Sequence, residues 1–279
     1  MAYWGWVFIF SVHAIFFIFW LSGFHHFYRY ACGAFMFVPF LAGLLGGLLG
    51  PLIGVGGGVV IVPLLNFSGA SFQSAVAASL FSIVVTSLTS IFNYRGLLNF
   101  RLLWRYMALS ASAAVLSALA SVKYSGEWVK LAYGVYLIVV GVVLLVEARP
   151  RRRAPVLGYL LIFAGGLASA LFGVGGGTVF VPALVLAMGF DAKAAAASSM
   201  GIILPTAVAS TLMYASLGVL DVVLGVAVAL GSFIGAFVAS RYIMPRLKSQ
   251  HVRKMFVGYV FAVGAYYLFS TGALLFSRT

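Results

Sequence analysis

Apolar stretches of about 20 residues follow one another along almost the whole chain, and each is long enough to cross a hydrocarbon core of about 30 Å. Only 8% of the 279 residues are charged, whereas a soluble domain has about a quarter. We therefore predict an all-α, polytopic membrane protein and exclude soluble folds. The apolar segments are 4–22, 33–50, 58–68, 73–94, 101–122, 128–147, 155–172, 177–190, 194–216, 219–240 and 255–273.

The chain also repeats itself. Residues 54–63 read GVGGGVVIVP and residues 173–182 read GVGGGTVFVP. Beyond these motifs the same offset pairs Ala77-Ala78-Ser79 with Ala196-Ala197-Ser198. These matches indicate an internal duplication. It predicts four parts: an extra N-terminal transmembrane helix and loop at 1–32, repeat 1 at 33–148, a basic cytoplasmic linker at 149–154, and repeat 2 at 155–279.

Two apolar segments, 58–68 and 177–190, are too short to span comfortably, and each follows a glycine-rich break. We predict that each is the returning limb of a broken helical hairpin. Each repeat then holds one hairpin followed by three spans. Segment 4–22 has no preceding Lys or Arg and no clear cleavage site, so we expect a retained span rather than a signal peptide.

The net charge of +13, from 17 Lys and Arg against four acidic residues, predicts orientation. Basic residues between spans face the cytoplasm, and this explanation excludes nucleic acid as a partner. The clusters at 95–105, 149–153 and 241–254 all reach the cytoplasmic side if each hairpin returns to its starting side. Each repeat then crosses an odd number of times, so the second copy is inverted relative to the first. Such inverted repeats with broken helices are typical of transporters with a site near the membrane midplane.

The glycine runs are the strongest candidates for a binding site. Non-helical backbone at membrane depth persists where protein or a watery cavity satisfies it. The helix that follows each run begins with unpaired N–H groups and the positive end of its dipole, which together favour an anion. The candidate residues are Gly56, Gly57, Gly58, Gly175, Gly176 and Gly177. The alternative is that glycines only allow helices to pack closely, which also suits Gly43, Gly46, Gly47 and Gly50.

Hydroxyl side chains line one side of the span after each hairpin and could donate hydrogen bonds to an oxyanion. Ser79 and Ser198, at matching repeat positions, are the best individual candidates, and Thr86 and Thr178 complete the predicted set. The alternative is that such hydroxyls bond back to their own helix.

The residue pattern gives little support for ion coupling, catalysis or metal binding. No acidic or basic residue lies clearly at the centre of a span, so no carboxylate pair is available for ion coupling. His13 in the first span could titrate or simply pack among aromatic residues. No nucleophile–base set and no metal-ligand set is present. We predict no enzymatic activity, no metal and no cofactor.

The duplicated G-x-G-G-G-x4-P motif, with the Ala-Ala-Ser run after each copy, resembles the sulfite exporter TauE/SafE family over residues from about 33 to 273. The resemblance implies a multi-pass permease in the cytoplasmic membrane that moves sulfite, organosulfonates or related compounds, usually outward. We expect a small sulfur-containing anion and the lipid bilayer as partners, and leave a homodimer open. The expected mechanism is alternating access; the alternatives are a channel-like anion pathway or another small anion.

Overall fold

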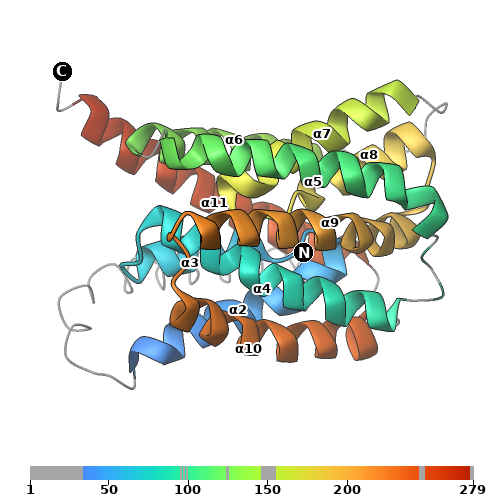
Figure 1. The fold of residues 1–279 in the computed structure, drawn as a ribbon, viewed down its shortest axis with the longest axis horizontal. Coiled ribbons are helices and arrows are strands. Elements are labelled where there is room, and N and C mark those ends of the chain that lie inside the picture. Colours follow the sequence, from blue (N-terminus) through green and yellow to red (C-terminus); the bar gives the residue numbers. More distant parts are fainter. Residues whose placement is uncertain are drawn as a thin grey trace, which may run out of the picture.

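A computed structural model describes residues 34–123, with gaps at 95, 97 and 99, and residues 126–145, 155–244 and 249–276. The predicted span at 4–22 and the whole basic linker at 149–154 lie outside the described residues. Within them the protein is all-helical (Figure 1). The helices are α2 (Ala34–Ile53), α3 (Gly58–Phe67), α4 (Phe72–Asn93), α5 (Phe100–Lys123), α6 (Glu127–Leu145), α7 (Pro155–Phe172), α8 (Gly177–Met188), α9 (Ala192–Ser216), α10 (Val222–Val238) with the π-helical turn η4 (Ala239–Ile243), and α11 (Ser249–Phe276).

Seven described helices are long and apolar enough to cross a membrane: α2, α4, α5, α6, α7, α9, and α10 with η4. The sequence also predicted seven full spans, but the seven segments are not the same ones. Both α2 and α7, predicted as hairpin limbs, have the length to cross, whereas the apolar stretch described in α11 is shorter, at Phe256–Gly272. Helices α3 and α8 have 10 and 12 residues, or about 15–18 Å at 1.5 Å per residue. They are therefore short returning limbs, as predicted.

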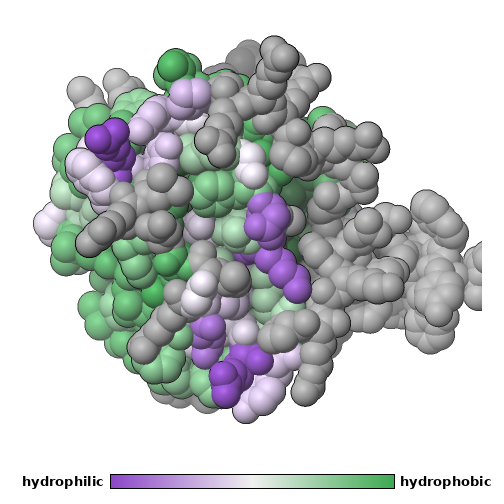
Figure 2. Space-filling model, turned by 90° about the vertical axis from the view of Figure 1, so that its right-hand side faces the viewer, coloured by the Kyte–Doolittle hydropathy of each residue, from purple (hydrophilic) through white to green (hydrophobic). Residues whose placement is uncertain are grey.

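The outer surface of the bundle is apolar, as a lipid-facing surface must be. Large hydrophobic side chains such as Leu160, Leu212 and Leu230 are more than half exposed. The charged residues that the structure describes, such as Glu127, Lys130 and Lys193, lie instead near helix ends. Figure 2 shows the end where α5 and α9 begin: hydrophilic residues, in purple, lie on this face, and hydrophobic residues, in green, lie around its edge. The molecule is a multi-pass integral membrane protein.

The helices of one repeat pack mainly on those of the other. Helix α2 packs along α10, and its counterpart α7 packs along α5, the counterpart of α10. In the same reciprocal way α10 packs on α4 and α5 packs on α9. Helices α4 and α9 contact each other near the centre of the bundle, and α6 pairs with α11 (Figure 1). The most extensive contacts between the two predicted repeats therefore have counterparts with the repeats exchanged.

Glycines set the distance between α2 and α10. A Cβ atom on Gly43 would lie 2.0 Å from the Val228 carbonyl oxygen, and one on Gly231 would lie 2.0 Å from the Phe40 carbonyl oxygen. Gly47 has the same relation to Ser232, at 2.4 Å. The close-packing interpretation of Gly43 and Gly47 is therefore confirmed, because only residues without a side chain let the two backbones come this near.

Candidate anion-binding site at the glycine-rich breaks

Each glycine run interrupts a helical hairpin, the first between α2 and α3 and the second between α7 and α8. Gly56 and Gly57 have φ of 89° and 92°, and Gly175 and Gly176 have φ of 83° and 76°. These left-handed conformations carry no steric penalty for glycine and cost other residues free energy. The break therefore needs glycine for its backbone shape, apart from any packing requirement.

The two breaks touch each other, backbone against backbone. A Cβ atom on Gly58 would lie 2.0 Å from the Gly173 carbonyl oxygen, and one on Gly177 would lie 2.1 Å from the Gly54 carbonyl oxygen. No side chain fits at either position. For Gly58 and Gly177 the close-packing interpretation thus holds, and this packing is what brings the starts of α3 and α8 together.

Two isoleucines mark the level at which the breaks meet. The Cβ positions of both Gly56 and Gly175 lie 3.3–3.7 Å from side-chain atoms of Ile83 and Ile203. Ile83 is near the middle of α4 and Ile203 near the middle of α9, so the breaks lie at mid-depth in the bundle. The sequence analysis did not single out these isoleucines, because nothing distinguishes them from other apolar residues in the same spans.

Several N–H groups at the breaks have no acceptor among the described residues. Val60 and Ile61 donate to the Gly57 carbonyl oxygen, and Val179 and Phe180 donate to that of Gly176. Within the described residues, the N–H groups of residues 56–59 and 175–178 have no hydrogen-bond partner, although all eight residues are buried. Nearly all buried N–H groups in proteins are paired, and an unpaired one costs about 1–3 kcal/mol. Eight such donors at two helix N-termini form a region of positive potential suited to an anion.

Two serines hold the breaks in place from the opposite repeat. The Ser79 hydroxyl donates to the Gly173 carbonyl oxygen at 2.7 Å, and the Ser199 hydroxyl lies 2.7 Å from that of Gly54. The counterpart of Ser79 in the structure is therefore Ser199, and the matching of Ser79 with Ser198 by sequence is corrected by one residue. The extra residue enters between the break and the following span, where α8 is longer than α3.

The remaining hydroxyl candidates have different surroundings. Thr86 donates to the Ser82 carbonyl oxygen of its own helix at 3.1 Å, and Ser90, Thr206 and Ser210 make the same kind of bond. For these side chains the alternative of bonding within the helix is confirmed. Thr178 shares a hydrogen bond with the Tyr136 hydroxyl. The Ser198 side chain is buried, and its part in binding stays a prediction.

Comparison with known proteins agrees with this architecture. The family model for the sulfite exporter TauE/SafE matches residues 39–267, which is most of the chain. The chain belongs to the TauE/SafE family. This membership makes it a membrane transporter and not an enzyme, and confirms the resemblance drawn from the glycine motifs.

Two similar proteins carry transporter names. The chain is 26% identical to "Probable membrane transporter protein YunE" of Bacillus subtilis (strain 168), over 69% of this chain and 83% of that protein. It is 29% identical to "Probable membrane transporter protein MJ0441" of Methanocaldococcus jannaschii, over 63% of this chain and 70% of that protein. No solved structure matches the chain.

Proposed function

We propose that this TauE/SafE transporter exports small sulfur-containing anions, such as sulfite or organosulfonates, through a site where the two glycine breaks meet. The observation that carries the proposal is the set of buried N–H groups at residues 56–59 and 175–178, which have no acceptor among the described residues. An anion between the breaks would accept hydrogen bonds from them.

The proposed site binds charge without presenting a charged side chain. Backbone N–H groups held by a rigid break replace the water around an oxyanion, and the dipoles of α3 and α8 add to the attraction. Side-chain atoms of Ile83 and Ile203 lie 3.3–3.7 Å from the Cβ positions of Gly56 and Gly175, and these side chains would exclude water on either side of the anion. Ser79 and Ser199 would act through the breaks, because their hydroxyls hydrogen-bond to the carbonyl groups of Gly173 and Gly54.

The arrangement of the repeats supports alternating access. From the breaks, α3 extends toward one end of the bundle and α8 toward the other (Figure 1). With an odd number of crossings in each repeat, the two copies would be inverted, and either hairpin could open the central site to its own side. The reciprocal contacts of Gly58 with Gly173 and of Gly177 with Gly54 fit a two-fold axis through the site.

The membrane potential would drive export. A potential of 100 mV, negative inside, contributes about 2.3 kcal/mol per charge, which corresponds to a gradient of tens-fold for a monovalent anion. No coupling ion is needed for net outward movement in this mechanism.

Flux into proteoliposomes at a set membrane potential tests the proposal, with labelled sulfite, a sulfonate, sulfate and phosphate compared. We expect saturable, potential-dependent flux of sulfur anions that Ile83→Phe abolishes, because the larger side chain fills the space beside Gly56 and Gly175. Leu88→Phe is the matched control, because Leu88 lies on the same helix with half of its side chain exposed. Flux that does not saturate would favour the channel-like alternative, and flux of another anion alone would contradict the proposed substrate. No flux of any anion would overturn the proposal.

A further inference from the structure

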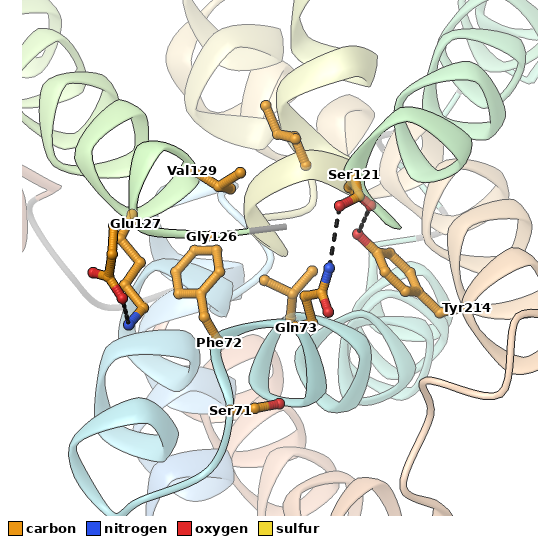
Figure 3. A pocket seen from close by; sticks show the side chains of 11 residues that line it. Ser71, Phe72, Gln73, Ser121, Gly126, Glu127, Val129 and Tyr214 are labelled. Carbon is orange, nitrogen blue, oxygen red and sulfur yellow. Dashed lines mark hydrogen bonds and ion pairs between the residues drawn. The ribbon is translucent and has the colours of Figure 1, made fainter. Parts of the chain in front are cut away.

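A pocket with both polar and apolar walls lies beside the second break, at the end of the bundle where α4 and α6 begin and α5 and α9 end (Figure 3). Its volume is about 160 Å³, enough for several water molecules or one small anion. The pocket is distinct from the glycine breaks, because its polar groups come from side chains near the helix ends: Gln73, Ser121, Glu127, Lys130 and Tyr214.

The polar groups of the pocket form two sets. On one side the Gln73 amide donates to the Ser121 carbonyl oxygen at 3.1 Å, and the Ser121 and Tyr214 hydroxyls are 2.6 Å apart. On the other side the Lys130 ammonium lies 3.1 Å from Oε1 of Glu127. The second carboxylate oxygen, Oε2, is buried and receives no hydrogen bond from any described residue. The ion pair is thus only half satisfied.

The wall of the pocket leads to the second break. Val76 lines the pocket, and its Cα atom and carbonyl oxygen lie 2.9 and 3.1 Å from the position that a Cβ atom on Gly173 would occupy. One turn further along α4, Ser79 holds the Gly173 carbonyl oxygen. Val76 of α4 therefore contacts both the pocket and the backbone of the second break.

We infer that this pocket is a second anion site, in which the transported anion replaces Glu127 as the partner of Lys130. The inference rests on the proposed function, because the ligand is the same small sulfur oxyanion or sulfonate. Lys130 is the one cationic side chain among the residues that line the pocket, and about 30% of its surface is exposed. A partly exposed pair three residues apart on a helix contributes little and is screened by salt, so an entering anion can displace the carboxylate.

Substitutions of the two partners are expected to act in opposite directions. Lys130→Met removes the cation and should raise the Kd and KM for sulfite about three- to tenfold, whereas Lys130→Arg should restore them. Glu127→Gln releases Lys130 from its competitor and should lower both constants. If the pair only stabilises the start of α6, both substitutions would weaken the protein and neither would improve binding. Lys193→Met is the control, because Lys193 is an exposed cation at the opposite end of the bundle, at the start of α9.

Binding of sulfite to the full chain in nanodiscs, measured beside flux in proteoliposomes, distinguishes this inference from the proposed function. Opposite shifts for Lys130→Met and Glu127→Gln support the second site. Equal shifts, or none, overturn it while leaving the central site intact. Lys130-dependent binding without any wild-type flux would contradict the proposed export alone. Absence of anion binding by the wild-type protein would overturn both.

Discussion

At the scale of single residues, the backbone rather than the side chains would bind the anion at the proposed central site. Gly56, Gly57, Gly175 and Gly176 adopt left-handed conformations, and the N–H groups that follow have no acceptor among the described residues. The hydroxyl of Ser79 is directed to the carbonyl group of Gly173. A hydroxyl has one proton, so in this geometry Ser79 positions the break, and the N–H groups remain the donors available to an anion.

The corrected pairing of Ser79 with Ser199 leads to a stability prediction. Ser79→Ala and Ser199→Ala each leave a buried carbonyl oxygen, that of Gly173 or Gly54, without its hydroxyl donor. Each should destabilise the protein by about 1–3 kcal/mol, visible as a lower thermal midpoint in detergent. Ser198→Ala is the matched control, because the Ser198 hydroxyl holds neither carbonyl group, and it should change the midpoint little. A larger effect of Ser198→Ala than of Ser199→Ala would show that the sequence pairing was right after all.

At the scale of helices, the short limbs α3 and α8 could be predicted because three adjacent glycines and a short apolar segment appear together twice. The one-residue shift that pairs Ser79 with Ser199 instead of Ser198 could not be predicted from the sequence. It depends on where α4 and α9 begin, which the N-caps Ser71 and Asp191 determine by accepting from the N–H groups of Ser74 and Ala194. Neither a motif search nor the hydropathy pattern detects such a shift.

The pocket around Lys130 was missed for a related reason. Its walls come from five different helices, and no local pattern shows that Gln73, Ser121 and Tyr214 lie together. Glu127 and Lys130 are visible in the sequence as a pair three residues apart, but such pairs are common at helix starts. Only the tertiary packing places this pair in a pocket that a ligand could enter.

The interface of α2 with α10 yields a second stability prediction. A Cβ atom on Gly235 would lie 2.3 Å from the Leu44 carbonyl oxygen, so Gly235→Val forces the two helices apart. We expect loss of the folded, monodisperse protein in size-exclusion chromatography. Ile234→Val, at the adjacent and largely exposed position, should elute like the wild type. Normal folding of Gly235→Val would contradict the close approach of these helices.

At the scale of the whole molecule, the proposed inversion of the repeats places equivalent connections on opposite sides of the membrane. The α3–α4 connection of repeat 1 corresponds to the α8–α9 connection of repeat 2. The α4–α5 connection corresponds to the α9–α10 connection. In a parallel duplication, both members of each pair would face the same side.

Single cysteines in a Cys32→Ala background test this arrangement. We expect Ser68→Cys and Leu217→Cys to react with a membrane-impermeant thiol reagent from outside the cell, and Phe100→Cys and Lys193→Cys to react only after the membrane is opened. All four side chains are exposed. The expected sides follow from the prediction that the basic clusters face the cytoplasm. Labelling of Ser68→Cys and Lys193→Cys from the same side would contradict the inversion.

The central claim, that backbone N–H groups at the breaks bind the transported anion, is tested most directly by replacing one amide with an ester. Incorporation of the α-hydroxy analogue of valine at Val59 removes an N–H group that has no acceptor among the described residues and leaves the side chain unchanged. The same exchange at Ile61, whose N–H donates to the Gly57 carbonyl oxygen at 3.2 Å, is the control. We predict that the ester at Val59 raises the KM for the anion roughly tenfold or more without loss of folded protein, and that the ester at Ile61 lowers stability with little change in KM. An unchanged KM with the ester at Val59 would contradict the account.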